Sequence, residues 1–180
     1  MSKAFKHIDW CLKKSEKEIK ECKRLGKRPK HRGLLKINPN IEEAKNHLAK
    51  AEHYLSVTEY LVKGKFSDIS VGTIFYTMYQ CFLSIASKFG YDSGNQSCTI
   101  SLVEFLKEQG KINIDERFLK YFMYEDEEID SIIELRENYT YGTNIEADKS
   151  KTDFFIKECK ELIDITKEII YSEELNKSKK

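Results

Sequence analysis

Proline and glycine are scarce in this chain, which has two prolines and eight glycines among 180 residues. Both residue types interrupt helices, so their scarcity predicts few turns and long, uninterrupted helices. The sequence also has no apolar run of roughly 18 residues, and we therefore expect no segment that spans a membrane. The first residues, MSKAFKHIDWCLKK, lack the apolar stretch of a signal peptide, which predicts a cytoplasmic protein.

Paired cysteine motifs are missing as well. The five cysteines lie at Cys11, Cys22, Cys81, Cys98 and Cys159, and no two of them form a CxxC pair. This odd, scattered set indicates neither a zinc site nor a disulfide framework. We expect free thiols that pack as small apolar side chains, and we predict no metal and no cofactor.

Charge is present in quantity but is unevenly distributed. The formal net charge is +1, yet residues 1–37 hold thirteen Lys and Arg against four Asp and Glu. The whole chain is 40% hydrophobic and 34% charged, which is an ordinary balance for a globular protein, and its length fits one domain. We predict a basic N-terminal helix and loop over 1–37, a helical bundle over 38–175 and a disordered tail over 176–180.

Hydrophobic periodicity predicts helices along most of the chain and indicates no strand. A peripheral helix with a thin apolar stripe comes first, over 4–24, and a mobile basic loop, GKRPKHRG, follows at 26–33. The strongest helical pattern begins at Asn40, which is a predicted N-cap because Glu43 occupies the capping-box position. This helix runs to Gly64.

The second half of the chain continues the helical pattern. The segment 66–90 has the broadest apolar face, and we expect it to be the central helix of the bundle. A loop is predicted at 91–97. Further helices are predicted over 99–109, over 115–121, from an N-cap at Asp126, and over 145–173. The predicted fold is all-α, an up-down antiparallel bundle of about five to six helices.

The stretch ELRENYTYG combines a cation with two phenols at a helix end. Arg136 lies four residues after Ile132 and three after Ile133, on the face that these isoleucines bury. A buried guanidinium needs a partner, because leaving it unpaired costs several kcal/mol. One interpretation is an ion pair with an acid of a neighbouring helix. The other is a cleft in which Arg136, Tyr139 and Tyr141 meet a bound anion.

The order of these elements resembles the HEPN domain family, named for higher eukaryotes and prokaryotes and for nucleotide binding. EEAKNHLAKAEHYLSVTEYLVKGKFSDISVGTIFYTMYQCFLSIASKFGY (42–91) is similar to the first two core helices of that family. ELRENYTYG, followed by the helix through FFIKECKELIDITKEII (154–170), is similar to its closing section. The resemblance covers about residues 40–172 and leaves the basic N-terminal segment outside it.

The resemblance implies a bundle that dimerises, with Arg136 facing the dimer cleft. Many members of the family are metal-independent ribonucleases that use an Arg and, a few residues later, a His. Others are non-catalytic partners of small nucleotidyltransferases. Tyr141 stands where the His is expected at the shortest spacing. A phenol with a pKa of about 10 is a poor base beside an imidazole of about 6.5.

We therefore predict a homodimer that binds RNA or a nucleotide through a cleft containing Arg136, in a toxin–antitoxin or defence context. Arg136 and Tyr141 are the candidate catalytic pair, with Asn138 and Tyr139 lining the cleft. Because Tyr141 stands in place of the expected His, the sequence does not decide between a ribonuclease and a protein that binds RNA without cleaving it. The alternative is a non-catalytic interaction module that partners a small nucleotidyltransferase.

The basic loop supplies a second set of candidate contacts, from Lys27, Arg28, Lys30 and Arg32. Such cations contact phosphates in a way that depends on salt and little on base sequence. The alternative is a solvated face that docks on the acidic residues 125–128 of a partner subunit. The composition favours neither interpretation over the other.

Overall fold

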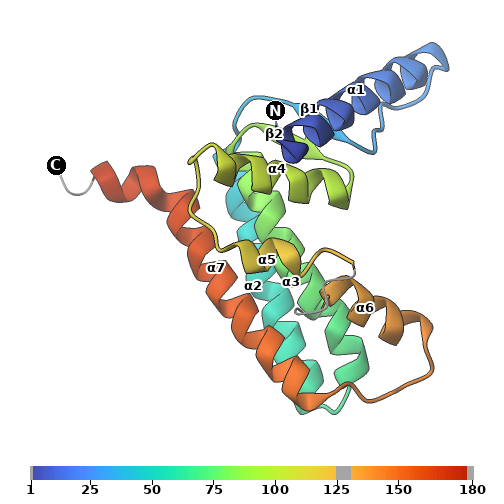
Figure 1. The fold of residues 1–180 in the computed structure, drawn as a ribbon, viewed down its shortest axis with the longest axis vertical. Coiled ribbons are helices and arrows are strands. Elements are labelled where there is room, and N and C mark those ends of the chain that lie inside the picture. The colour runs from blue at the N-terminus through green and yellow to red at the C-terminus, as the bar shows by residue number, and fades with distance from the viewer. Residues whose placement is uncertain (1, 125–130, 178–180) are drawn as a thin grey trace.

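The computed structural model describes residues 2–124 and 131–177, which form a helical bundle with one small sheet (Figure 1). This confirms the predicted all-α fold class, and the described part contains seven helices where about five to six were predicted. In chain order the elements are α1 (Lys3–Arg24), β1 (Leu34–Lys36), α2 (Ile41–Lys63), α3 (Ser67–Lys88), β2 (Tyr91–Ser93), α4 (Gln96–Glu108), α5 (Glu116–Lys120), α6 (Ile132–Tyr141) and α7 (Lys149–Lys177).

The central helix is α3, as its broad apolar face predicted. Helices α2 and α7 run beside it, α6 covers its first half, and β2 continues from its end (Figure 1). Its fully buried side chains include Ile74, Met78, Phe82 and Ile85. By length and composition, α3 alone among the described helices could cross a membrane. Because 67% of its most apolar window is buried inside the bundle, this is weak evidence for a membrane span.

Helix boundaries agree with the sequence signals in part. The Asn40 side chain caps α2 by accepting a 3.0 Å hydrogen bond from the Glu43 backbone N–H. Helix α6 begins later than predicted, because Ser131 caps it through the backbone N–H of Glu134. The predicted cap, Asp126, lies outside the described residues.

The last helix is displaced toward the C-terminus relative to its prediction. Helix α7 begins at Lys149 rather than at residue 145, because the Asp148 carboxylate accepts hydrogen bonds from the backbone N–H groups of Ser150 and Lys151. At its other end α7 reaches Lys177, so the first residues of the predicted tail, 176–180, are helical.

The prediction that the chain has no strand, with a loop at 91–97, was wrong. Strands β1 and β2 form an antiparallel pair in which Leu34 faces Ser93 and Lys36 faces Tyr91. Each strand has three residues, which is too short for an alternating pattern to stand out in the sequence. Gly33 precedes β1 at a close crossing, where an added Cβ would lie 2.3 Å from the Cys11 carbonyl oxygen.

The prediction of five free thiols was also wrong. A disulfide joins Cys11 of α1 to Cys98 of α4, across a sequence separation of 87 residues, and both side chains are fully buried. Cys22, Cys81 and Cys159 are free. Burial raises the pKa of the Cys81 thiol to about 12 and that of Cys159 well above its usual value, so both are poor nucleophiles.

The basic N-terminal segment is attached to one end of the bundle. Helix α1 packs on α4 and β1 rather than along the long helices, so its predicted peripheral position is confirmed (Figure 1). Its buried face is narrow and consists of Ala4, Ile8, Cys11 and Ser15. The disulfide, the sheet and this thin stripe together connect residues 1–37 to the rest of the fold.

A polar network joins α5 to α7 and gives a stability prediction. The Arg117 guanidinium donates to Glu158 at 2.8 Å and also contacts Glu161, and the Tyr121 hydroxyl donates to Glu158 at 2.8 Å. Only 7% of the Glu158 side chain is exposed. Arg117→Met removes the cation that faces this buried carboxylate, so we expect the free energy of unfolding to fall by about 2 kcal/mol.

Urea denaturation measures this effect, and a matched variant controls for the loss of a cation. Lys160 forms an exposed 2.7 Å pair with Glu59. Because exposed pairs contribute little, Lys160→Met is expected to change the free energy of unfolding by less than about 0.5 kcal/mol. Equal losses in the free energy of unfolding would show that this network, despite the burial of Glu158, stabilises the fold no more than an exposed ion pair does.

Candidate functional site

Arg136 lies on α6 with its guanidinium against an aromatic ring of α3. The guanidinium carbon is 4.1 Å from the centroid of Phe75, and Nη2 is 3.6 Å from Oε1 of Glu137. Within residues 2–124 and 131–177, its ion-pair partner is the next residue of the same helix and not an acid of a neighbouring helix. The side chain remains 23% exposed. Stacking on Phe75 orients this cation and leaves part of the side chain exposed.

Glu137 links Arg136 to a phenol of the preceding segment. The Tyr124 hydroxyl donates a 2.9 Å hydrogen bond to Glu137 Oε1, and this bond is the main reason that the pKa of Tyr124 is raised. Glu137 therefore offsets part of the positive charge of Arg136. The guanidinium remains able to contact an anion from the solvent side.

A groove of about 510 Å³ lies between α2, α3 and α6. Its lining combines aromatic rings, hydroxyls and one carboxylate: Tyr54, Asp68, Ile69, Gly72, Thr73, Tyr76, Tyr139 and Thr140. The rings of Tyr54 and Tyr76 stack with centroids 5.6 Å apart and an interplanar angle of 24°. Tyr139 and Thr140 follow Arg136 by three and four residues, so they lie on the same side of α6.

The predicted residues of this region do not all meet in the groove. Tyr139 lines it, and Arg136 lies one turn away, just outside the lining. Asn138 is exposed, and Tyr141 is 82% exposed at the end of α6. Tyr141 follows Arg136 by five positions on α6. At 3.6 residues per turn, this spacing makes their side chains point about 140° apart. The candidate catalytic pair therefore does not converge.

Sequence reasoning missed the members of the groove on α2 and α3. Tyr54 lies off the apolar stripe of α2, and Tyr76 lies on the exposed side of α3. In the sequence, Tyr76 extends the apolar face of 66–90 and favours burial on more than one side, whereas the structure leaves it 44% exposed. Gly72 was a further signal in the sequence, because a glycine within a helix leaves space on the surface of that helix. In the structure, a Cβ added at Gly72 would meet nothing within 4 Å.

The second candidate surface is basic and is built by α1 and the loop 26–33. Between them lies a hollow of about 790 Å³ whose lining holds four cations and two carboxylates: Lys14, Lys17, Glu18, Glu21, Cys22, Lys30, His31 and Arg32. The loop was predicted to be mobile, but several hydrogen bonds anchor it. His31 contacts Ser15 and Asp92, each at 3.1 Å, and the Arg32 backbone N–H donates to Glu18.

Among the residues that the structure describes, no carboxylate of the bundle pairs with a Lys or Arg of this surface. The ion pairs that Lys and Arg of residues 1–37 form within the described part of the chain, Lys13–Asp9 and Arg24–Glu21, both lie inside α1. The predicted contact residues Lys27, Arg28, Lys30 and Arg32 are all exposed. Residues 125–128, the acidic stretch on which this segment could dock, lie outside the described residues.

Helices α1 and α6, which carry parts of the two candidate surfaces, lie toward opposite ends of α3 (Figure 1). Helix α6 contacts the first half of α3, through Phe75, whereas α1 and the sheet lie near the end of α3, where β2 begins. A helix of 22 residues is about 33 Å long, which sets the scale of the separation. One mononucleotide cannot reach both surfaces, but an extended strand can.

Comparison with known proteins adds no assignment. No protein-family model matches the chain, and no curated protein matches it.

Proposed function

We propose that this chain is a HEPN-type helical bundle that binds single-stranded RNA. The observation that carries the proposal is the basic surface of α1 and the loop 26–33, whose exposed cations have no carboxylate partner from the bundle within the described residues. Phosphates are the ligands that such a surface attracts, and their binding releases condensed counterions. The tyrosine-lined groove is the proposed site for a base.

The groove suits a nucleobase because its walls offer rings and hydroxyls. Base–aromatic stacking contributes about 1–3 kcal/mol per base and tolerates different bases. Tyr76 and Tyr139 supply rings from two helices, and Arg136 lies within one turn to meet an adjoining phosphate. The strand would run from this groove along the bundle to the basic surface.

The proposal is binding without cleavage by Arg136 and Tyr141. General base catalysis needs a base within hydrogen-bond reach of the attacked proton. Tyr141 points away from Arg136, and the groove lining contains no imidazole. An incubation with mixed RNA in EDTA is expected to leave the RNA intact, whether Arg136 is present or replaced by Ala.

Fluorescence anisotropy with a labelled single-stranded RNA, measured in EDTA over a series of salt concentrations, tests RNA binding. We expect the logarithm of the association constant to fall linearly with the logarithm of the salt concentration. Binding that does not respond to salt would contradict a phosphate-led interaction. Absence of binding even at low salt would reject RNA as the ligand.

Groove variants separate the base site from the phosphate surface. Tyr139→Ala is expected to weaken RNA binding about tenfold, within the range for loss of one stacked base. Gly72→Leu is expected to weaken it similarly by filling the groove, without loss of stability, because space surrounds this position and Gly is unfavourable in a helix. Tyr141→Ala is the matched control and should bind as the wild type does. Three equal affinities would exclude the groove from RNA contact.

A second candidate, a non-catalytic interaction module, is favoured by one observation. The described residues of the groove lining include no Lys or Arg, and two of the large apolar side chains in it, Ile69 and Tyr76, are exposed. The connection to α7 adds Ile145, and it is held near α3 by a 2.9 Å hydrogen bond from Ala147 to Ser67. This face would dock a second copy of the chain or a small nucleotidyltransferase.

Sedimentation of Ile69→Glu beside the wild type tests whether this face joins two copies of the chain. If it does, the variant becomes a monomer, since a carboxylate would be buried in the contact. If both proteins sediment alike, the face is not a homodimer contact.

A further inference from the structure

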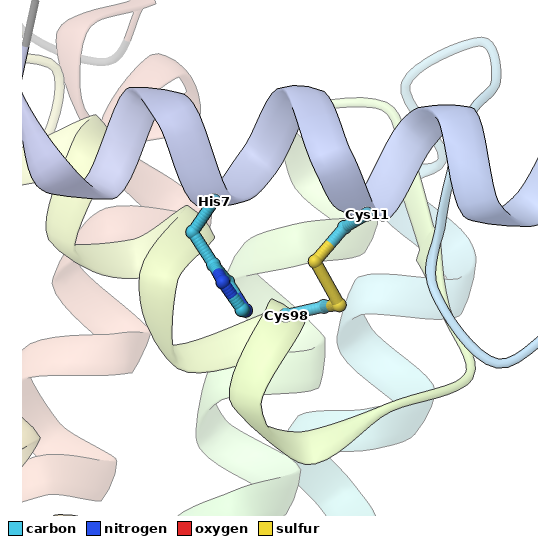
Figure 2. Close-up of side chains that lie close together, drawn as sticks. All are labelled: His7, Cys11 and Cys98. Atoms are coloured by element: carbon cyan, nitrogen blue, oxygen red, sulfur yellow. A yellow bond between two sulfur atoms is a disulfide. The ribbon is translucent and has the colours of Figure 1, made fainter.

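Three side chains with metal-binding atoms meet where α1 crosses α4. His7 and Cys11 lie one turn apart on the same face of α1, and both point toward Cys98 in the first turn of α4 (Figure 2). The ligand atoms of the three residues all lie within 4.8 Å of one another. The sulfur atoms are fully buried, so the cluster is enclosed between the two helices.

The imidazole of His7 is the unexplained member of this cluster. Its Nε2 is the one buried side-chain nitrogen or oxygen in the described part of the chain that lacks a hydrogen-bond partner. The ring stacks on Trp10 with centroids 5.4 Å apart, which holds it in place. Leaving a buried polar atom unsatisfied costs about 1–3 kcal/mol. A disulfide offers Nε2 no adequate partner, whereas a metal ion would.

We propose that His7, Cys11 and Cys98 form a redox-gated zinc site. In the reduced protein the two thiolates and the lone pair of Nε2 would bind one Zn²⁺, and a water would take the fourth position. Zinc favours this donor set, with Zn–S of about 2.3 Å and Zn–N of about 2.0–2.1 Å in a tetrahedron. Such a tetrahedron puts ligand atoms roughly 3.3–3.8 Å apart. The three side chains therefore need only small movements to adopt it.

The oxidised and zinc-bound forms exclude each other because they use the same two sulfurs. A thiol-class reductant supplies two electrons and two protons, the S–S bond breaks, and Cys11 and Cys98 become thiols. Zn²⁺ then displaces the two thiol protons. In the reverse direction a disulfide-class oxidant takes two electrons from the thiolates, the S–S bond re-forms and Zn²⁺ leaves. Either state holds α1 against α4.

Cys98 lies in the first turn of α4, where its backbone N–H donates to the capping Asn95. The remaining cysteines lie outside the cluster, and two of them are inert because burial raises their pKa.

Zinc titration of the full chain tests the proposal. The protein is reduced with a phosphine, separated from excess reductant without oxygen, and titrated with Zn²⁺ against a chromophoric chelator. We expect one Zn²⁺ per reduced chain and none per oxidised chain. Cobalt is the second probe, and tetrahedral Co²⁺ with thiolate charge-transfer bands should appear in the reduced protein alone. Equal zinc binding by both redox forms, or none by the reduced form, would overturn the site.

His7→Ala separates a built site from incidental thiol binding. This variant keeps both sulfurs and can be purified folded in the oxidised form. After reduction its zinc affinity should be at least tenfold lower than that of the wild type, whereas His53→Ala, an exposed histidine on α2, should leave it unchanged. Equal affinities for these two variants would overturn the role of His7. If the reduced wild type unfolds, addition of Zn²⁺ should restore its circular dichroism, and failure to do so would also overturn the proposal.

Discussion

Reduction of the Cys11–Cys98 disulfide is expected to lower the free energy of unfolding by about 4 kcal/mol when EDTA removes metal ions. The disulfide closes a loop with a sequence separation of 87 residues. In the chain-entropy model, a loop of roughly this length gives about 4–5 kcal/mol, because the cross-link restricts the unfolded chain. Domains are stable by about 5–15 kcal/mol, so this one bond accounts for a large share.

Urea unfolding of the oxidised and reduced protein measures the difference. The double variant Cys11→Ala, Cys98→Ala should unfold like the reduced wild type and should not respond to reductant. Cys22→Ala is the control, because Cys22 is a free cysteine on the same helix, and it should retain the full response. Equal midpoints for oxidised and reduced wild type would contradict a stabilising role for the disulfide.

The loss of stability after reduction of the disulfide should begin at α1. This helix contacts α4 and β1 and has a narrow buried face, so little else holds it once the disulfide is open. Hydrogen exchange of the reduced protein in EDTA is expected to accelerate first in α1, while the buried amides of α3 remain protected.

Neutralising the basic loop is expected to weaken RNA binding on the order of 100-fold at low salt. The variant replaces Lys27, Arg28, Lys30 and Arg32 with Gln. The logarithm of the association constant falls with the logarithm of the salt concentration, and each phosphate contact on a single strand contributes about 0.7 to the steepness of that fall. Losing four contacts should therefore make the slope shallower by about 3. Because all four side chains are exposed, the fold should be unaffected.

A second quadruple variant has the same net charge as the loop variant but alters another part of the surface. Gln would replace four exposed lysines of the bundle: Lys63, Lys111, Lys149 and Lys157. Long-range attraction falls equally in both proteins, so any difference between them reports local contact. If both variants lose the same affinity, the loop is not a contact surface and only the overall charge matters.

The helices were predictable because their signals are local. Asn40 and Glu43 form a cap within one turn, and the apolar face of 66–90 fixes the central helix from its own residues. The starts of α6 and α7 differ from their predictions, because Ser131 and Asp148 are caps as good as the residues that the sequence favoured.

Contacts between distant parts of the chain were not predictable from one sequence. Cys11 and Cys98 carry no mutual spacing signal, although His7 and Cys11 are visibly one turn apart. Likewise, Tyr54 and Tyr139 share a groove only because α2 and α6 both pack on α3. For Arg136 the sequence identified the helix face correctly, but it could not identify Phe75 as the ring beneath the guanidinium.

Ultraviolet cross-linking of the wild-type protein to single-stranded RNA, followed by mass spectrometry of the joined peptides, tests the central proposal most directly. We predict cross-linked peptides from α1 and the loop 26–33, and a second set from the groove around Tyr76 and Tyr139. Cross-links confined to other surfaces, or none under conditions where RNA is in excess, would contradict RNA binding as proposed.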